Sequence, residues 1–239
     1  MKVTNTQYNF ENSLARIDEI LDAPNGNYQE KDSIPTGGLT YNNGYYVNCT
    51  AIFVDICNSS DMTDKHRRPV LAKIYRSFIS EMVAMFNDFK QCREISINGD
   101  CVWAVFDTSS SQDVNRAFDA ACKANSLVKV LNNRWENKGY DTHNANIGMD
   151  YGRALMIQAG YKGSGINDIL WMGDVVNSAC HLCNEKRNSS DAPILLGYEV
   201  YQRLNEDYQA LCYKYDTRRQ VYSCSAVNRK LNNWLKEQY

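Results

Sequence analysis

Two short stretches, Ala51-Ile-Phe-Val-Asp55 and Ile95-Ser-Ile-Asn-Gly-Asp100, decide the fold of this chain. The first is a continuous apolar run that ends on a carboxylate, which is typical of a strand buried on both faces. The second runs into an Asn98-Gly99 pair, which predicts a hairpin turn with positive φ angles and places Asp100 at its tip. If the first strand and the hairpin are neighbours, the two carboxylates face each other across a sheet. Hard divalent cations favour that arrangement.

Each aspartate alone has an ordinary explanation. Asp is common at strand ends and in turns, so neither residue by itself indicates a metal. The hypothesis of a metal site rests on the pair and on the order of the elements around it.

The composition predicts one domain with a well-formed core. The chain has 239 residues, a formal net charge of -2 and a pI near 5.9, so no nucleic-acid polymer is expected as a partner. Its nine cysteines are odd in number and follow no signal peptide, which predicts reduced thiols in the cytoplasm. Every apolar run is far shorter than the roughly 20 residues of a membrane helix, so no membrane partner is expected.

Hydrophobic periodicity predicts the remaining elements. An amphipathic helix at 10–21 leads into an irregular, Gly-, Asn- and Pro-rich connection at 24–46, and a polar loop at 58–65 precedes a long helix from Pro69. Further helices are expected at 114–135, 174–186 and 198–204, strands at 146–151, 154–158, 169–172 and 193–196, hairpins at 94–106 and 211–224, and a flexible loop at 160–167. The 154–158 strand is expected to be the partner of 146–151.

The order of these elements predicts the fold class. Strand, helix, strand, strand, helix, strand is the ferredoxin-like βαββαβ pattern, an α+β fold with an antiparallel sheet and helices packed on it. We divide the chain into an N-terminal helix and connection at 1–46, a catalytic domain at 47–225 and an amphipathic C-terminal tail at 226–239.

Three segments in this order resemble the signatures of the class III nucleotide cyclase catalytic domain. They are the two stretches quoted above, the first extended to Ile56, and Trp171-Met-Gly-Asp-Val-Val-Asn177-Ser-Ala. The resemblance implies that Asp55, Asp100 and the carbonyl of Ile56 hold two Mg²⁺ or Mn²⁺ ions, and that Asn177 orients the ribose. It also implies an in-line attack of the ribose 3′-oxygen on the α-phosphorus, assisted by two metals, in a homodimer whose active sites are shared between protomers.

The third segment departs from the family pattern. Where the family has an arginine one helical turn after the asparagine, this chain has His181, which lacks the fixed guanidinium fork. Whether His181 or one of four nearby cations replaces that arginine is left open by the sequence. These cations are Lys186, Arg187, Arg153 and Lys162.

The base pocket departs from the pattern as well. Ser96 stands where adenylate cyclases have Lys and guanylate cyclases have Glu, and Leu170 stands at the other purine-reading position, unless a shifted register brings in Asp168. In lacking both purine-reading residues, the chain resembles the uridylate and cytidylate cyclases of Pycsar anti-phage defence, which make cyclic UMP or cyclic CMP as a signal. Tyr46, just upstream of the first strand, is either a base contact or an aromatic residue packed at the strand entrance. Lys214 aligns with a triphosphate-binding lysine of the family, and the alternative is an exposed hairpin lysine.

The resemblance implies a cytoplasmic enzyme that converts UTP or CTP to the 3′,5′-cyclic nucleotide and pyrophosphate, and a separate effector that senses the product. Two alternatives remain from the sequence. One is an adenylate or guanylate cyclase with a remodelled base pocket. The other is a degenerate, nucleotide-binding pseudocyclase that regulates a partner, although two retained metal aspartates favour the enzyme.

Overall fold

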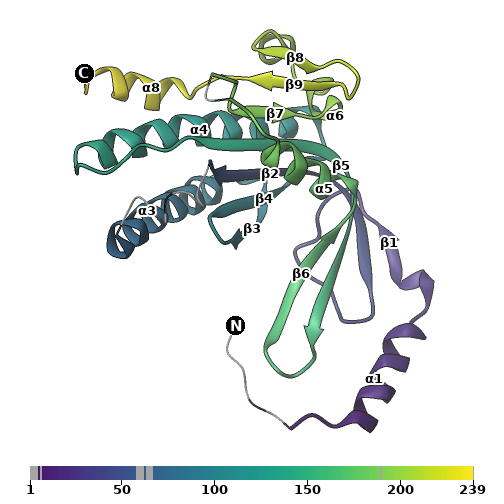
Figure 1. Ribbon diagram of the computed structural model, residues 1–239. Coiled ribbons are helices and arrows are strands. Elements are labelled where there is room, and N and C mark those ends of the chain that lie inside the picture. The colour runs from purple at the N-terminus through teal and green to yellow at the C-terminus, as the bar shows by residue number, and fades with distance from the viewer. Residues whose placement is uncertain (1–4, 6, 58–61, 63–66, 189, 239) are drawn as a thin grey trace.

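The computed structural model describes residues 5, 7–57, 62, 67–188 and 190–238 (Figure 1). Its helices are α1 (Phe10–Leu21), the 3₁₀ turn η1 (Asn25–Asn27), α3 (Arg68–Asn87), α4 (Ser111–Glu136), α5 (Asp174–Asn184), α6 (Tyr198–Tyr201), α7 (Glu206–Gln209) and α8 (Arg229–Lys236). Its strands are β1 (Tyr28–Glu30), β2 (Gly44–Ile56), β3 (Cys92–Asn98), β4 (Cys101–Asp107), β5 (Ala145–Tyr161), β6 (Ile166–Met172), β7 (Ile194–Leu196), β8 (Cys212–Asp216) and β9 (Val221–Cys224).

One sheet organises the chain, with strand order β3-β4-β2-β5-β7-β9-β8, while β1 pairs with β2 and β6 with β5. Strand β2, in which Asp55 is the residue before the last, lies inside the sheet and is antiparallel to β4 and β5, with Val54 opposite Val102 and Asp55 opposite Asn146. The expected βαββαβ core is therefore present in β2, α3, β3, β4, α4 and β5. The sheet as a whole is mixed, because β1 pairs with β2 and β7 with β5 in parallel.

The two faces of β2 bury different cores. Ile52, Val54 and Ile56 belong to the large core that contains the apolar side chains of α3 and α4, whereas Ala51 and Phe53 belong to a smaller core with side chains of α5. This division follows from the two-residue period of a strand. In Figure 1, α3 and α4 accordingly lie on one side of the sheet and α5 on the other. Because Asp55 is two residues from Phe53, its side chain lies on the α5 side.

Helix α5 is held very close to β5. A Cβ atom on Gly148 would lie 2.1 Å from the carbonyl oxygen of Ala179 and 2.3 Å from the amide nitrogen of Cys183. Only a glycine allows this approach of two backbones. The helix begins after Gly173, which lies against Arg153 and Ala154, so α5 runs antiparallel to β5 with its C-terminal turn toward the Asp55 end of the sheet.

The long hairpin of β5 and β6 differs from the expectation. Residues 154–158 are not a partner strand of 146–151, because β5 continues without a break from Ala145 to Tyr161. Gly152 does not interrupt the strand, because it is paired with Cys49 of β2, and a Cβ atom there would meet Val175 of α5 only at an ordinary contact distance of 3.4 Å. The segment 160–167 is a turn between two paired strands, with Gly163 and Gly165 at positive φ. Together β5 and β6 form an arm that extends away from the rest of the sheet (Figure 1).

Other boundaries also shift. The connection at 24–46 contains η1, β1 and the start of β2, so Tyr46 lies inside a strand. The turn of the β3–β4 hairpin is formed by Gly99 and Asp100, with positive φ at Gly99 but not at Asn98, as in a type II′ turn. The helix expected at 198–204 ends at Tyr201, and α5 ends at Asn184. The polar loop expected at 58–65 falls, apart from Met62, outside the described residues.

The first and last helices are present where the sequence predicts them, α1 at Phe10–Leu21 and α8 in the C-terminal tail. Within the described part of the chain, no helix combines the length and apolar character needed to cross a membrane.

Candidate active site

Asp55 and Asp100 lie together at one end of β2. Since Val54 is opposite Val102, the chain brings Asp55 level with Cys101 and next to the Gly99-Asp100 turn. Both carboxylates are half-buried. The sequence prediction that the first strand and the hairpin are neighbours, with the two carboxylates close together, is therefore confirmed by the sheet register.

The two carboxylates are electrostatically unfavourable neighbours. Burial, and then the charge of Asp100, raise the pKa of Asp55 to about 6, while a hydrogen bond from the amide of Ile56 opposes this effect. The Oδ2 atom of Asp100 is buried and has no hydrogen-bond partner among the described residues. A cation between these groups would offset the repulsion and fill the unused acceptor.

The donor set fits a hard cation that keeps open positions. Among the described residues, no three His, Cys, Asp or Glu side chains are placed to hold a metal ion together. Mg²⁺ is commonly bound by one or two carboxylates, with water and substrate phosphate as the remaining ligands. Asp55 and Asp100 match that coordination pattern, and a backbone carbonyl such as that of Ile56 would add a further oxygen ligand.

Thiols border the carboxylates but do not form a soft-metal site. Burial, followed by the charges of Asp55, Cys180 and Asp100, raises the pKa of Cys101 to about 12. Burial also raises the pKa of Cys180 and of Cys183, each of which lies close enough to feel the charge of Asp55. These thiols are therefore protonated at neutral pH, whereas zinc is bound by thiolates.

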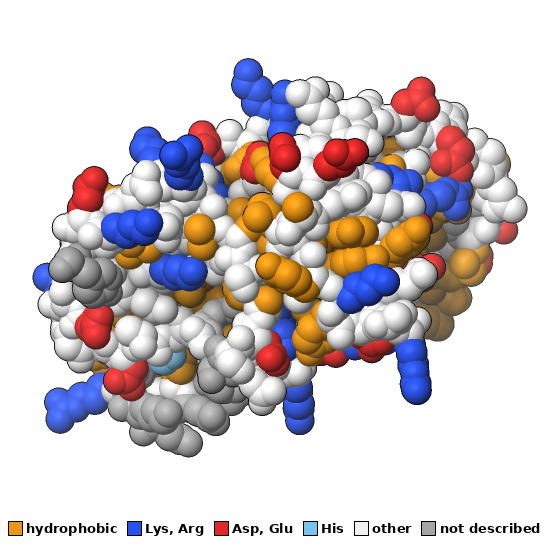
Figure 2. Space-filling model, turned by 90° about the horizontal axis from the view of Figure 1, so that it is seen from above, with side chains coloured by type: hydrophobic (Ala, Val, Ile, Leu, Met, Phe, Trp, Pro, Cys, Tyr) orange, Lys and Arg blue, Asp and Glu red, His pale blue; other side chains and the backbone are white. Residues whose placement is uncertain are grey.

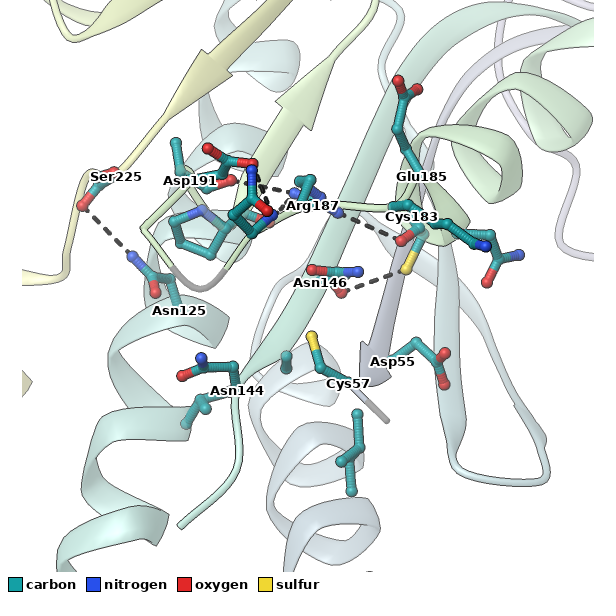
Figure 3. A pocket seen from close by; sticks show the side chains of 18 of the residues that line it. Asp55, Cys57, Asn125, Asn144, Asn146, Cys183, Glu185, Arg187, Asp191 and Ser225 are labelled. Atoms are coloured by element: carbon teal, nitrogen blue, oxygen red, sulfur yellow. Dashed lines mark hydrogen bonds between the residues drawn. The ribbon is translucent and has the colours of Figure 1, made fainter. Parts of the chain in front are cut away.

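A polar cavity of about 670 Å³ opens beside Asp55. Its walls come from the ends of β2 and β5, the middle of α4, and the segment 183–193 between α5 and β7. Figure 3 shows Asp55 and Cys57 on one side of this cavity and Arg187 and Asp191 on the other. The side chains of Lys129 and Lys186 also line it, so the space can accept a polar ligand that carries negative charge.

Asn177 and His181 lie one helical turn apart on α5, and both side chains are exposed. Neighbouring residues fix the position of α5 on the sheet. Val175 and Ala179 are buried toward the sheet, and Ser178 donates a hydrogen bond to Asp150 of β5. The spacing expected for a ribose-orienting asparagine and a second polar group on one face is therefore present. That face points away from the protein's own core.

Arg187 is engaged elsewhere and is not a free guanidinium. It donates hydrogen bonds to the carbonyl oxygens of Leu182 and Cys183 at 3.2 Å each, of Ala192 at 3.1 Å and of Pro193 at 2.6 Å. These bonds cap the C-terminal end of α5 and connect it to the start of β7. Sequence reasoning missed this role, because nothing in the sequence pattern indicates which carbonyls an arginine will meet.

The other candidate cations differ in whether another residue of the chain already binds them. Arg153 forms an ion pair with Glu30 and stacks on the ring of Tyr46, with its Cζ 3.8 Å from the ring centre. Lys162 is exposed in the turn between β5 and β6, and Lys186 is exposed just after α5. Among the five candidates for the missing arginine, His181 and Lys186 are the two that are exposed and lie on α5 or just after it.

Tyr46 is far from the metal candidates of its own chain. Both residues lie on β2, and nine residues at about 3.3 Å each separate Tyr46 from Asp55 by roughly 30 Å. A single nucleotide cannot contact both. Tyr46 can contact the base of a nucleotide at the aspartates only if those aspartates belong to another copy of the chain.

Ser96 occupies the face of the sheet that carries Phe53 and Trp103. It is opposite Trp103 in the register, and Trp103 is opposite Phe53, whose ring it stacks at 5.1 Å. Ser96 is partly exposed, and Leu170 and Asp168 are exposed on β6. Glu94, which belongs to no motif in the sequence, accepts a hydrogen bond of 2.8 Å from the indole of Trp171 and thereby connects β3 to β6.

Lys214 is exposed on β8, the edge strand of the sheet. Four strand spacings of about 4.8 Å separate β8 from β2, so the structure places Lys214 roughly 19 Å across the sheet from the metal candidates of the same chain. Its role as a phosphate contact remains a prediction.

A βαββαβ sheet with paired carboxylates at one end and a polar face of α5 beside them is the arrangement expected of a nucleotide cyclase domain. The sequence profile of the adenylate and guanylate cyclase catalytic domain matches residues 42–225. The chain is 41% identical to the uridylate cyclase of Gulbenkiania mobilis, over 99% of both proteins. It is 31% identical to the uridylate cyclase of Treponema porcinum, over 97% of this chain and 82% of that protein. The chain therefore belongs to the adenylate and guanylate cyclase catalytic domain family and is a nucleotide cyclase.

Solved structures agree on the fold. The adenylyl cyclase CyaB from P. aeruginosa matches with a TM-score of 0.65 and 19% identity, covering 78% of this chain and 97% of that chain. The guanylyl cyclase Cya2 matches with a TM-score of 0.64 and 12% identity, covering 78% of this chain and 95% of that chain. The α+β fold predicted from the sequence is thus confirmed.

Proposed function

We propose that the protein is a pyrimidine nucleotide cyclase that converts UTP, or CTP as the second choice, to the 3′,5′-cyclic nucleotide and pyrophosphate. The observation that carries the cyclase chemistry is the Asp55–Asp100 pair, with a raised pKa on one carboxyl and an unused buried oxygen on the other. The pyrimidine preference is supported by relatives named uridylate cyclase that align with nearly the whole chain. It is also supported by Ser96 and Leu170 at the purine-reading positions.

The metal-binding residues set the position of the reaction. Two Mn²⁺ or Mg²⁺ ions held by Asp55, Asp100 and the carbonyl of Ile56 would lower the pKa of the ribose 3′-hydroxyl and neutralise the triphosphate. Asp55 and Asp100 supply the anionic ligands. Asn177 orients the ribose through its amide, so that the 3′-oxygen is in line with the departing pyrophosphate.

His181 replaces a fixed guanidinium fork with an imidazole ring. A ring N–H of His181 can donate one hydrogen bond to an α-phosphate oxygen. Lys186, exposed at the rim of the cavity beside Asp55, provides a second cation for the phosphates, and Lys214 a third in the assembled protein.

The active site is proposed to be shared between two protomers of a homodimer. Tyr46 lies roughly 30 Å along β2 from Asp55, while Asn177 and His181 point away from their own core. All three residues are thus available to a nucleotide bound at the aspartates of a second copy. A twofold arrangement would create two such sites.

Base selection is proposed to depend on Ser96 and Tyr46. Uracil offers two carbonyl acceptors, which the hydroxyl groups of a serine and a tyrosine can meet as donors. A purine would find neither the lysine nor the glutamate that reads its edge in other family members. Sites that hydrogen-bond one base edge reject analogues that leave polar groups unpaired, by up to roughly 10⁴-fold.

The biological role is proposed from the resemblance to the pyrimidine cyclases. The cyclic nucleotide is a cytoplasmic signal of bacterial anti-phage defence, sensed by a separate effector. A nucleic-acid polymer and a membrane are not partners in this proposal. On the face seen in Figure 2, Lys and Arg side chains are interspersed with Asp and Glu rather than gathered into one basic field, which supports a small-molecule substrate.

Separate incubations of purified protein with UTP, CTP, ATP and GTP in Mn²⁺, with the product identified by mass spectrometry, test the proposal. We expect cyclic UMP in largest yield and no product from the Asp55→Ala protein. Cyclic AMP or cyclic GMP as the main product would favour a purine cyclase with a remodelled pocket. Binding of UTP without any product would favour the pseudocyclase.

A further inference from the structure

Two cysteines at the far edge of the sheet form a pair that the cyclase chemistry does not use. In the antiparallel register of β8 and β9, Cys212 is directly opposite Cys224, and the two thiols are hydrogen-bonded to each other. Residues directly opposite on antiparallel strands have Cα atoms about 4.5–5.5 Å apart. A disulfide needs about 4.4–6.8 Å, so the backbone already meets this requirement.

The surroundings give the two sulfurs different chemistry. The sulfur of Cys224 is buried and accepts a hydrogen bond from the amide of Ala226 at 3.3 Å, in addition to the one from Cys212. These donors lower the pKa of Cys224, chiefly through the Cys212 thiol. Cys212 is partly exposed and lies 3.4 Å from the carbonyl oxygen of Tyr208. The hydrogen bond with Cys224, followed by burial, raises the pKa of the Cys212 thiol well above its usual value. The pair thus combines a buried sulfur that accepts hydrogen bonds with a thiol that is partly exposed.

The other cysteines lack this combination. Burial is the main cause that raises the pKa of each of the remaining seven thiols, including those beside Asp55. A thiol is a poor nucleophile until it loses its proton. Cys212 and Cys224 differ from these seven in lying directly opposite each other on paired strands. The chain therefore distinguishes one pair by position.

We propose that Cys212 and Cys224 are a thiol modification site, at which a low-molecular-weight disulfide such as glutathione disulfide forms a reversible intramolecular disulfide. The partly exposed Cys212 thiol first loses its proton and attacks glutathione disulfide, forming a mixed disulfide and releasing one glutathione, which takes up that proton. Cys224 then loses its proton, attacks the Cys212 sulfur and displaces the second glutathione, which takes up the second proton. Two protein thiols are oxidised and one glutathione disulfide is reduced to two glutathiones.

The new bond would close a loop of residues 212–224 that contains Lys214. A cross-link of this length stabilises a protein by restricting its unfolded chain. Since the register already sets the two residues opposite each other, little native strain is expected. The oxidised protein should melt roughly 5–10 °C higher than the reduced protein.

The chain offers a direct assay. Folded protein is incubated with glutathione disulfide, free thiols are blocked with N-ethylmaleimide, and the protein is digested with trypsin without reduction. Cleavage after Arg203, Lys214, Arg219 and Arg229 puts Cys212 in the peptide 204–214 and Cys224 in the peptide 220–229, each as its only cysteine. A cross-linked pair of these two peptides identifies the bond. Cys212→Ser is the test variant, and Cys92→Ser, at a partly exposed cysteine of β3, is the matched control.

We expect the 204–214/220–229 species to form before any other disulfide in wild-type and Cys92→Ser protein, to disappear on adding dithiothreitol, and to be absent from Cys212→Ser. The melting temperature should rise on oxidation in the first two proteins only. A different cysteine pair as the first product would overturn the proposal, as would labelling of Cys212 and Cys224 by N-ethylmaleimide to the same extent with and without glutathione disulfide. A lower melting temperature after cross-linking would refute the claim that the native register fits the bond. The wild-type measurement needs no variant to fold.

Discussion

Replacing Asp55 by Asn should have opposite effects on stability without and with metal. The pKa of Asp55 is raised from 3.8 to about 6 by burial and by Asp100. Because the folded protein binds this proton more tightly than the unfolded chain, stability is highest at low pH. It falls as the pH rises from about 4 through 6, and it stays lower above that range.

The size of the effect follows from the same shift. Two pKa units correspond to about 3 kcal/mol, but Asp55 is only half-buried, and solvent screening reduces the expected cost to about 1 kcal/mol. Asp55→Asn should therefore raise the melting temperature by about 2–4 °C at pH 7.5 in EDTA. The difference should shrink toward zero near pH 4, where the carboxyl of the folded wild type is protonated.

Mn²⁺ should make the wild-type protein more stable than Asp55→Asn. At a Mn²⁺ concentration of 100 times its dissociation constant, wild type gains about 2.7 kcal/mol, or about 5–10 °C, and Asp55→Asn should gain little. The assay is thermal unfolding of both proteins between pH 4 and 8, with EDTA or Mn²⁺. Asp207→Asn, at an exposed residue of α7, is the control and should change neither series by more than about 0.5 kcal/mol. Equal stabilisation of wild type and Asp55→Asn by Mn²⁺ would refute the metal site.

Two further predictions concern assembly and the support of α5. Mixing inactive Asp55→Ala and Asn177→Ala proteins should restore about a quarter of wild-type activity. Half of randomly formed dimers are mixed, and each mixed dimer has one intact site out of two. A mixture that stays inactive after proven subunit exchange would exclude active sites shared between protomers. Arg187→Ala should destabilise the protein by about 2–4 kcal/mol in urea unfolding, because four carbonyls lose a charged donor. The control is Arg219→Ala, which removes exposed ion pairs with Glu185 and Asp216. It should cost less than about 1 kcal/mol. Equal losses in the two variants would contradict the role given to Arg187.

The sequence was sufficient for the features that local chemistry determines. Apolar runs and helical periodicity placed the βαββαβ core, and the position of Asp55 and Asp100 followed from a strand end and a turn. The register of β2 against β4 then brought the two residues together as expected. A single uninterrupted strand at 145–161 was missed, since Gly152 and Arg153 resemble a break, whereas pairing with β2 continues through both residues.

Features that depend on distant contacts could not be predicted in the same way. The sequence left Arg187 as a candidate phosphate ligand, but folding directs it to four carbonyls around the end of α5. It placed Tyr46 before the first strand, whereas pairing with β1 and β5 makes it part of β2. The hydrogen bond between Glu94 and Trp171 joins residues 77 positions apart. Such pairings emerge from the tertiary arrangement rather than from motif spacing.

The most direct test of the account is a competition among UTP, CTP, ATP and GTP at equal concentrations in Mn²⁺, with all four cyclic products quantified by mass spectrometry. We expect cyclic UMP to form fastest and cyclic CMP to be the second product, and we expect both to exceed the cyclic purine nucleotides by orders of magnitude. A kcat/KM for ATP or GTP equal to that for UTP and CTP would contradict the pyrimidine assignment, although the cyclase fold would stand.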